Sequence, residues 1–210
     1  MIGILFDLDG TLLDTLQDLT DSTNAALTAF GYPGRTLGEV RRFVGNGALE
    51  LMRKAVPDGE NPELVLAYFQ KHYPAHCRIH TAPYAGVTEA LEELKGQYPM
   101  AIVSNKPDAA VKELCAELFP GIFAIGERPD CRRKPAPDMV HQAMKAIGVE
   151  RCVYVGDSEV DIATAKNAGV PCLTVTWGFR EEAELIAAGA QHLCHSVGTL
   201  VKRIRDLTAL

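Results

Sequence analysis

Two aspartates stand one residue apart in the sequence ILFDLDGTLLD, directly after a short apolar run. They are Asp7 and Asp9, and Gly10 and Thr11 follow them. Carboxylates so close together repel one another unless a positive charge lies near both. In an extended segment residues i and i+2 point the same way, so both acids would face one pocket. One carboxylate could then attack phosphorus while the other transfers a proton.

Three further polar stretches carry residue types that suit the same chemistry. They contain Ser104 and Asn105, Lys134, and the acidic pair Asp157 and Asp161. Acidic residues from distant parts of a chain suit a hard divalent cation bound by oxygen ligands, and Mg²⁺ is the ion we expect here. A cation and a lysine together suit a phosphoryl group. These residues therefore predict a magnesium-dependent site for phosphoryl transfer.

Each stretch also has a simpler interpretation when it is taken alone. The first acidic pair could form an Asx turn with two solvated carboxylates, and the second could be acids at a helix start. Ser104 and Asn105 could cap a helix that begins near Pro107. Lys134 lies in the sequence RRKP, so it could belong to a solvated basic run. The four stretches together favour a catalytic site over these separate explanations.

The elements that must position these residues are six short apolar runs, each bounded by turn residues. They cover residues 2–7, 100–105, 121–127, 152–157, 172–177 and 191–195. Nearly unbroken apolar runs are typical of strands buried on both faces. Helical periodicity lies between them at 86–97 and 108–119, and this alternation predicts an α/β fold with a doubly wound, Rossmann-like parallel sheet. Ligands of such sheets bind beyond the carboxyl ends of the strands, where three of the four polar stretches stand.

One long interval, residues 15–81, breaks this rhythm. It contains no strand-like run and is far longer than a crossover between strands requires. Its pattern predicts helices: an apolar stripe over 16–30, a second group in LGEVRRFVGNGALELMRKAV, and a third that begins at the capping pair Asn61-Pro62. We therefore expect a helical cap domain at 15–81, inserted into a catalytic core formed by 1–14 and 82–210.

Composition limits the kinds of partner and compartment. The chain has 210 residues, 47% of them apolar, and a formal net charge of −6. An acidic balance argues against general binding of nucleic acid, which needs a basic face. No apolar run approaches the roughly 18 residues of a membrane span, and a signal sequence is not recognisable. Six cysteines occur without a CxxC pair, so we expect buried thiols and a cytoplasmic protein.

The ordered sequences DLDGTLLDT, SN, KP and GDSEVD resemble the four motifs of the haloacid dehalogenase-like hydrolase superfamily. Four longer stretches are similar to its phosphoglycolate phosphatase branch: VRRFVGNGALELM, SNKPD, GDSEVDIATAKNAGVP and TWGFRE. The resemblance implies a Rossmann-like core with a helical cap inserted after the first motif. It also implies a Mg²⁺-dependent phosphatase that hydrolyses a small phosphomonoester through an aspartyl-phosphate.

The same resemblance implies a role for each motif residue. Asp7 would be the nucleophile, and Asp9 would protonate the leaving alkoxide and then activate water. Phosphoryl oxygens would be held by Gly10, Thr11, Ser104, Asn105 and Lys134, and Lys134 would also neutralise developing charge and screen Asp7. Mg²⁺ would bind Asp7, the backbone carbonyl of Asp9, and Asp157, while Asp161 would support the metal waters or Lys134.

The substrate is less constrained than the reaction. We favour 2-phosphoglycolate, and a sugar phosphate or pyrophosphate is the alternative. A small carboxylate substrate would need a cation besides Lys134, for which Lys106, Arg42 and Arg180 are candidates. Whether Arg132 or Arg133 touches substrate is left open. A phospho-aspartate signalling module, similar to a response-regulator receiver, is the alternative from another class, but such a module has no use for the inserted helices.

Two stretches resemble ligand sites that we consider weaker. GNG at 45–47 follows no strand, so a turn between cap helices is the simpler interpretation, and a loop that closes over substrate is the sharper one. HYPAHCRIH at 72–80 offers three histidines and a cysteine, but a proline interrupts it and the spacing is not that of a zinc site. We expect this second stretch to link the cap to the core.

Overall fold

Strand β1 (Ile2–Phe6) lies in the middle of the main sheet and is buried on both faces. In the computed structural model, which describes residues 1–209, Ile4, Leu5 and Phe6 expose no surface. The strand pairs in parallel with β4 (Met100–Pro107) on one side and β6 (Arg151–Gly156) on the other. Because both faces of such a strand meet apolar layers, its sequence is an unbroken apolar run rather than an alternating one.

The main sheet formed by residues 1–209 has six parallel strands in the order β5-β4-β1-β6-β7-β8. The three strands not yet located are β5 (Phe123–Glu127), β7 (Cys172–Val175) and β8 (His192–Cys194). Each coincides with an apolar run that was predicted as a strand. The doubly wound, Rossmann-like α/β fold is therefore confirmed.

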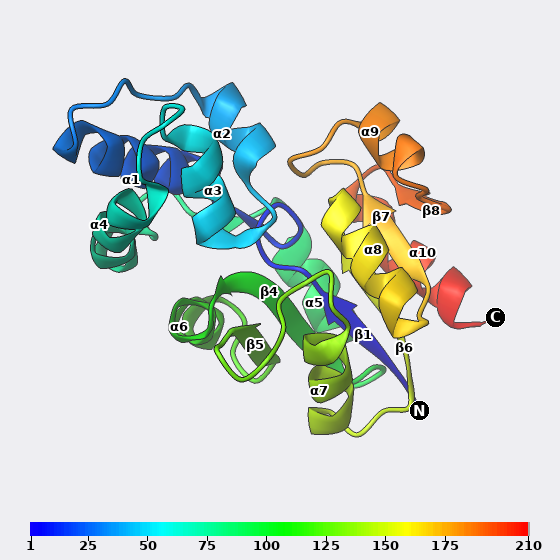
Figure 1. Ribbon diagram of the computed structural model, residues 1–210. Helices are drawn as coiled ribbons and strands as arrows, with labels where there is room; N and C mark the ends of the chain where they lie inside the picture. The colour runs from blue at the N-terminus through cyan, green and yellow to red at the C-terminus, as the bar shows by residue number, and fades with distance from the viewer. Residues whose placement is uncertain (210) are drawn as a thin grey trace. The chain divides into compact units, whose positions relative to one another are not determined.

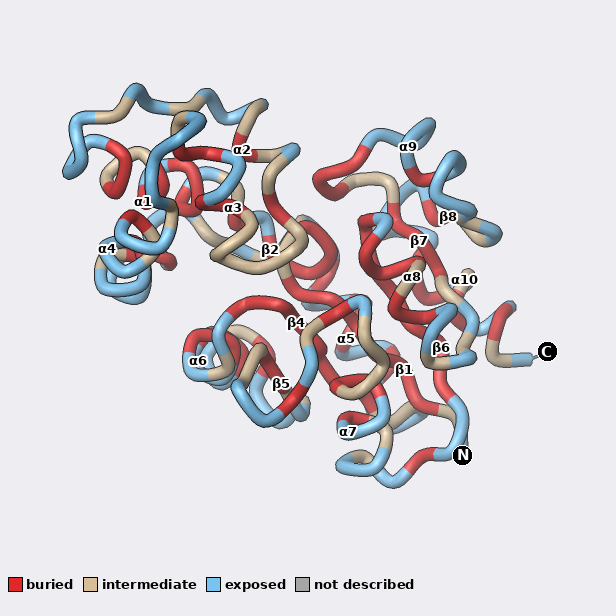
Figure 2. Tube along the Cα trace, in the orientation of Figure 1, coloured by how far each residue is buried: buried red, intermediate tan, exposed pale blue. Residues whose placement is uncertain are grey.

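Helices cover both faces of this sheet (Figure 1). On one face α7 (Asp138–Ala146) packs beside α8 (Glu159–Ala168), and on the other α5 (Val87–Leu94) packs beside α10 (Leu200–Thr208). The remaining helices of this unit are α6 (Asp108–Leu118), which packs on β4 and β5, α9 (Glu182–Ala187) and the short η1 (Val197–Thr199). Figure 2 shows the strands and the inner faces of these helices as the buried part of the unit.

The order in which the chain adds strands to the sheet changes direction at β1. The chain passes from β1 to β4 and β5 on one side, then returns to β6, β7 and β8 on the other. Such a reversal leaves a crevice at the carboxyl ends of the central strands, and ligands of open α/β sheets bind there. Asp7, Ser104 and Asp157 lie at or just beyond the carboxyl-terminal parts of β1, β4 and β6.

Residues 13–82 form a second compact unit, and the first consists of Met1–Leu12 with Pro83–Leu210. The second unit contains α1 (Leu16–Ala29), α2 (Leu37–Phe43), α3 (Gly47–Ala55) and α4 (Pro62–His76). The segments at its two ends, β2 (Leu13–Asp14) and β3 (Ala82–Pro83), form a two-stranded sheet. Among residues 1–209 no helix has both the length and the apolar character that a membrane crossing requires.

Helix α4 begins as the sequence predicted and ends later than expected. Asn61 caps it, because its side-chain oxygen accepts the N–H of Glu63 at 2.9 Å. The helix continues through Pro74 to His76, so the first half of the expected linker at 72–80 is helical. Its apolar face is buried through Val65, Phe69 and Tyr73, and the rings of Phe69 and Tyr73 stack with centroids 5.0 Å apart. Burial of this face offsets the backbone donor that is lost at the proline.

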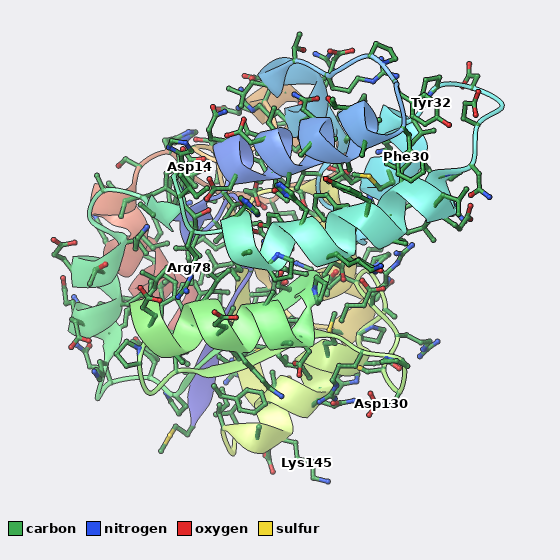
Figure 3. The ribbon with its side chains drawn as sticks, turned by 90° about the vertical axis from the view of Figure 1, so that its left-hand side faces the viewer. Asp14, Phe30, Tyr32, Arg78, Asp130 and Lys145 are labelled. Carbon is green, nitrogen blue, oxygen red and sulfur yellow. The ribbon has the colours of Figure 1, made fainter. Side chains whose placement is uncertain are left out.

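The structure shows the local geometry of the two weaker ligand motifs. Gly45 and Gly47 adopt positive φ angles of 126° and 80°. Gly45 lies in the turn between α2 and α3, and Gly47 is the first residue of α3. The rings of His72 and His76 stack with centroids 3.8 Å apart. Within residues 1–209 neither histidine belongs to a group of three or more potential metal ligands. Figure 3 shows Phe30 and Tyr32 together at the end of α1, where their rings also stack.

One buried carboxylate closes the helical unit on itself. Asp18 in α1 has 1% of its surface exposed, and it accepts the backbone N–H of His80 at 2.9 Å and that of Thr81 at 2.9 Å. These bonds attach residues 80–81, where the chain leaves the unit, to α1, the first helix after the chain enters it. Because they are charge-assisted, they are stronger than bonds between neutral groups.

We expect Asp18→Ala to lower the free energy of unfolding by about 2–4 kcal/mol, because two backbone N–H groups lose their buried, charged acceptor. Urea unfolding followed by circular dichroism measures this change. Asp21→Ala is the matched control, since Asp21 is an exposed acid of the same helix whose carboxylate accepts from the side chain of Gln17 at the surface. Equal effects of the two substitutions would contradict the proposed role of Asp18.

Candidate active site

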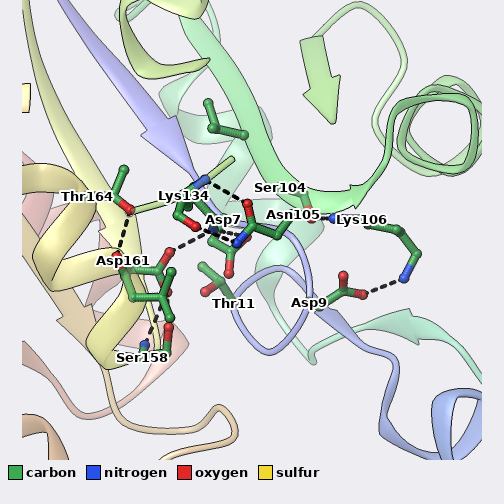
Figure 4. A network of polar contacts seen from close by, with 12 residues as sticks. Asp7, Asp9, Thr11, Ser104, Asn105, Lys106, Lys134, Ser158, Asp161 and Thr164 are labelled. Carbon is green, nitrogen blue, oxygen red and sulfur yellow. Dashed lines mark hydrogen bonds and ion pairs between the residues drawn. The ribbon is translucent and has the colours of Figure 1, made fainter. Parts of the chain in front are cut away.

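Asp7 and Lys134 form the centre of the site at the carboxyl end of β1 (Figure 4). The Nζ atom of Lys134 lies 2.7 Å from Oδ1 of Asp7 and 2.8 Å from Oδ1 of Asp161. It also donates to the hydroxyl of Tyr154 at 3.2 Å. Lys134 is 2% exposed, so its ammonium group is surrounded by protein and held in one orientation.

Asn105 fixes the backbone of the loop that carries Lys134. Its side-chain Oδ1 accepts the N–H of Lys134 at 2.8 Å, and its Nδ2 donates to the carbonyl of Lys134 at 3.0 Å. These two bonds tie the loop to β4, on which Asn105 lies. The side chain of Asn105 is thus directed at Lys134.

Asp157 is enclosed from two sides at the end of β6. Its Oδ1 accepts the hydroxyl of Thr11 at 3.1 Å, and its Oδ2 accepts the N–H of Phe179 at 2.7 Å. A Cβ atom added at Gly10 or at Gly178 would collide with its carboxylate. Gly10 also has a φ of +86°, which side-chain-bearing residues rarely adopt. Both positions must therefore be glycine for Asp157 to sit where it does.

Asp161 combines a structural and a site role. It is the third residue of α8, and its Oδ2 accepts the hydroxyl of Ser158 at 2.7 Å and the N–H of Ser158 at 3.2 Å, which completes a capping box. Its Oδ1 faces Lys134 and the hydroxyl of Tyr154. The helix-start interpretation and the supporting role predicted for this residue are thus both consistent with its contacts.

Burial shifts the ionisation of this cluster in the absence of a cation. Burial and the neighbouring carboxylate of Asp161 raise the pKa of Asp7 well above its usual range, and Lys134 opposes that rise. Burial likewise raises the pKa of Asp157 to about 7, again with a contribution from Asp161. Burial alone would lower the pKa of Lys134, but Asp161 and Asp7 more than compensate and hold it well above its usual value. The cluster therefore holds more negative groups than its lysine can neutralise.

The donor set fits a divalent cation. Asp7, Asp157 and Asp161 each offer a carboxylate oxygen, and these oxygens lie within 4.8 Å of one another. All three residues are buried, and a hard cation with oxygen ligands would relieve their mutual repulsion. Another group of this kind, Asp18 with Asp21 and His80, lies in the helical unit, but Asp18 is already bonded to two backbone N–H groups.

Asp9 has a lysine partner of its own, which the sequence did not assign. The chain turns directly after Asp7, since the N–H groups of Thr11 and Leu12 both donate to the carbonyl of Leu8. The extended geometry expected over this stretch therefore ends with the strand. Asp9 keeps 15% of its side chain exposed, and its Oδ1 lies 2.9 Å from Nζ of Lys106.

The other candidates separate into those near the site and those engaged elsewhere. Ser104 is 2% exposed and accepts the N–H of Lys106 at 3.2 Å, and it does not cap α6, whose N-cap residue is Pro107. Arg180 is buried and pairs with Glu159 at 2.7 Å. Of the other candidate arginines, Arg132 pairs with Asp138 and Arg133 pairs with Glu127. Arg42 lies in α2 of the helical unit.

Tyr154 is the site residue that sequence reasoning missed. Its hydroxyl accepts from Lys134 and lies 3.2 Å from Oδ1 of Asp161, to which it donates. The residue is fully buried in β6. The available signal was a hydroxyl-bearing side chain in an otherwise aliphatic run, and a buried tyrosine usually has a partner for that hydroxyl.

Comparison with known proteins gives a consistent result. The family model of the haloacid dehalogenase-like hydrolases matches residues 4–175. The chain is 37% identical over 190 residues to phosphoglycolate phosphatase 1 of Pseudomonas aeruginosa, a match that covers 84% of this chain and 70% of that protein. It is 36% identical over 194 residues to a phosphoglycolate phosphatase of Cereibacter sphaeroides, which covers 86% of this chain and 87% of that one.

Solved structures with the same fold include one from Lactobacillus delbrueckii subsp. bulgaricus. It superposes with a TM-score of 0.91 at 35% identity, over 96% of this chain and 97% of that one. A predicted phosphatase from Clostridium acetobutylicum superposes with a TM-score of 0.84 at 28% identity, over 98% of this chain and 99% of that one. The likeness thus extends over the helical unit as well as the sheet.

The raised pKa of Asp157 predicts a pH-dependent stability of the metal-free protein. The folded state keeps a proton up to about pH 7 that the unfolded chain releases near pH 4, so raising the pH through this window favours unfolding. We therefore compare the free energies of unfolding of Asp157→Asn and the wild type. The difference between them should change by roughly 1–3 kcal/mol in favour of the variant when the pH is raised from 5 to 8. Urea unfolding in EDTA at pH 5 and at pH 8 measures this change.

Asp130→Asn is the control for that comparison, because Asp130 is an exposed acid. Its difference from the wild type should be the same at both pH values. A difference between Asp157→Asn and the wild type that does not change with pH would contradict the prediction.

Proposed function

The chain belongs to the haloacid dehalogenase-like hydrolase family, and we propose that it hydrolyses a small phosphate monoester, with 2-phosphoglycolate as the favoured substrate. The family and the named relatives support a hydrolase of phosphoric monoesters. The observation that carries the proposal is the buried Asp7 at the end of β1, with Lys134 at 2.7 Å and a second acid, Asp9, two residues on. The two relatives named phosphoglycolate phosphatase support the choice of substrate.

In the first proposed step a carboxylate oxygen of Asp7 attacks phosphorus, and the bond between phosphorus and the ester oxygen breaks. Asp9 gives its proton to the departing oxygen, so the alcohol leaves neutral and Asp7 carries the phosphoryl group. Lys134 offsets negative charge on the reacting groups from its fixed position between Asp7 and Asp161. The phosphoryl oxygens are proposed to be held by the backbone N–H of Gly10 and by Ser104, Asn105 and Lys134. Thr11 is proposed to join them by exchanging the 3.3 Å bond from its N–H to the carbonyl of Leu8 for one to the substrate.

In the second proposed step Asp9 takes a proton from water, and the water oxygen attacks phosphorus. The bond between phosphorus and the oxygen of Asp7 breaks, inorganic phosphate leaves, and the free carboxylate returns. Covalent capture divides one difficult displacement into two easier ones. It also explains why two acids are needed at this position, one as nucleophile and one to move protons.

We propose that the cluster binds Mg²⁺ through Asp7, Asp157 and the backbone carbonyl of Asp9, with Asp161 as support. When bound, the ion would neutralise charge on the phosphoryl oxygens and on the nucleophile. The excess of buried carboxylates described above supports a divalent ion at this position. Asp161 suits the supporting role because its Oδ1 accepts from Nζ of Lys134 while its Oδ2 accepts from Ser158 at the start of α8.

The helical unit is proposed to be a cap that excludes water and limits the substrate to small molecules. Its presence in the chain also argues against a receiver-like signalling module, which has no use for four inserted helices within residues 13–82. Five of the six cysteines are buried thiols, a use of cysteine typical of reducing compartments, so we propose that the protein is cytoplasmic.

A substrate panel tests the proposed function. We expect kcat/KM to be highest for 2-phosphoglycolate among that ester, sugar phosphates and pyrophosphate. Asp7→Asn should lower kcat for every substrate by at least about 10³-fold, because it removes the nucleophile. Asp130→Asn should leave the rates unchanged. Substantial turnover by folded Asp7→Asn protein would remove Asp7 from the mechanism, and a higher kcat/KM for another ester would change the substrate.

Removal of the ion is a separate prediction. EDTA should abolish phosphate release, and Mg²⁺ added in excess should restore it. Mg²⁺ should also raise the melting temperature of the wild type, because an ion that binds only the folded state stabilises it. Asp157→Asn should lose this thermal shift. Full activity after chelation, or an equal thermal shift in the variant, would contradict the proposed metal site.

A further inference from the structure

Lys106 occupies a fixed position beside the candidate active site. It lies near the end of β4, where the pairing with β5 shifts register between Val103 and Pro107. A Cβ atom at Gly126 of β5 would lie 2.6 Å from the carbonyl oxygen of Lys106, so the two backbones are in close contact there. The side chain of Lys106 is 3% exposed. The sheet and the burial of its side chain therefore hold the ammonium group of Lys106 in place, unlike that of a mobile lysine on the surface.

The position of this charge is defined relative to the reacting atoms. Nζ of Lys106 lies 2.9 Å from Oδ1 of Asp9. A general acid must come within about 2.6–3.2 Å of the oxygen that it protonates. With Asp9 donating its proton to the ester oxygen, the ammonium group of Lys106 would lie on the leaving-group side, about two hydrogen-bond lengths from that oxygen if one oxygen of Asp9 contacts both. In 2-phosphoglycolate the carboxyl carbon is two bonds from the ester oxygen, so the carboxylate would come within reach of Lys106.

We propose that Lys106 is the residue that recognises the carboxylate of the substrate. The assignment rests on the proposed function and adds the basis of its selectivity: a short phosphate ester with an anionic group next to the ester linkage. It also means that the core, through β4, contributes to specificity in addition to the helical unit.

The other candidate cations in the sheet-containing unit are engaged elsewhere. Lys134 contacts Asp7, Asp161 and Tyr154 beneath the nucleophile. Arg180 is buried against Glu159. Lys106 is the candidate whose charge lies beside Asp9, on the leaving-group side of the reaction.

Contact with Asp9 does not prevent Lys106 from binding a second carboxylate. An ammonium group has three N–H donors, and Lys134 shows in this same site that one lysine can bridge two acids. Lys106 would bridge Asp9 and the substrate in the same manner. A neutral hydroxyl at that place could still accept a hydrogen bond from the ammonium group, but it could not form the ion pair that a carboxylate forms.

The test compares two esters that differ in this substituent: 2-phosphoglycolate and 2-hydroxyethyl phosphate. Both have a primary alkoxide leaving group and make a similar demand on Asp9. We expect Lys106→Met to reduce the preference for 2-phosphoglycolate, expressed as the ratio of the two kcat/KM values, by about 10- to 100-fold. Lys106→Arg, which keeps the charge, should keep most of the preference.

Lys145→Met is the matched control, since Lys145 is exposed at the end of α7 (Figure 3) and the ratio should not change. If Lys106→Met does not fold, Lys106→Gln replaces it, because its polar end tolerates the neighbourhood of Asp9. The proposal is overturned if both esters lose activity equally, which would mean that Lys106 acts only through Asp9, or if the ratio is unchanged.

The wild-type enzyme separates this proposal from the one on which it rests. If the wild type hydrolyses both esters with equal kcat/KM, the role of Lys106 fails while the phosphatase assignment stands. If it hydrolyses no phosphate monoester, the proposed function itself fails.

Discussion

The contact of one buried ammonium group with two carboxylates is the interaction on which the rest of the site depends. Lys134 lies between Asp7 and Asp161 at 2.7 and 2.8 Å, and it is almost fully removed from water. A charge buried in this way is tolerable only if its partners are fixed, because removal of one partner leaves an uncompensated ion. The surrounding structure supplies that fixation through the amide of Asn105, the hydroxyl of Tyr154 and the capping box of α8.

These supports come from four separate parts of the chain: the end of β1, the end of β4, the loop before α7, and β6 with the start of α8. The parallel sheet brings them together because the carboxyl ends of its three central strands meet at one edge. The fold and the chemistry are thus linked through a small number of side-chain bonds. The register of β1 with β4 and β6 fixes where those strand ends lie relative to one another.

Much of this could be predicted from the sequence. The six strands were recognisable because strands buried on both faces have unbroken apolar runs, and the inserted helices because residues 15–81 lack such a run. Most of the predicted site residues stand at or just beyond strand ends, while Lys134 lies in a loop and Asp161 in the first turn of α8, and a doubly wound sheet brings these parts together. The periodicity of α5, with Val87, Ala90, Leu91 and Leu94 buried, was equally clear.

What could not be predicted depends on tertiary contacts or on local turns. The pairing of Lys106 with Asp9 joins residues far apart in sequence, and Lys106 lies where β4 shifts register against β5, which no pattern in the sequence specifies. The bond from Asn105 to the Lys134 backbone joins residues far apart in sequence, so it follows only from the folded chain. The turn after Asp7 overrode the extended geometry because Gly10 adopts a left-handed conformation. Helix α4 continues through Pro74 because its buried face outweighs one lost backbone bond.

The enclosure of Asp157 has a consequence for the choice among ions. Its carboxylate is flanked by Gly10 and Gly178, and two donors fix both of its oxygens, so it has little freedom to rotate. Calcium accepts irregular shells of six to eight oxygens from ligands that adjust to it, whereas magnesium requires a small, nearly octahedral shell. A carboxylate that cannot turn to meet a larger ion disfavours calcium. In the proposed metal site, two glycines that carry no functional group of their own would in this way favour magnesium over calcium.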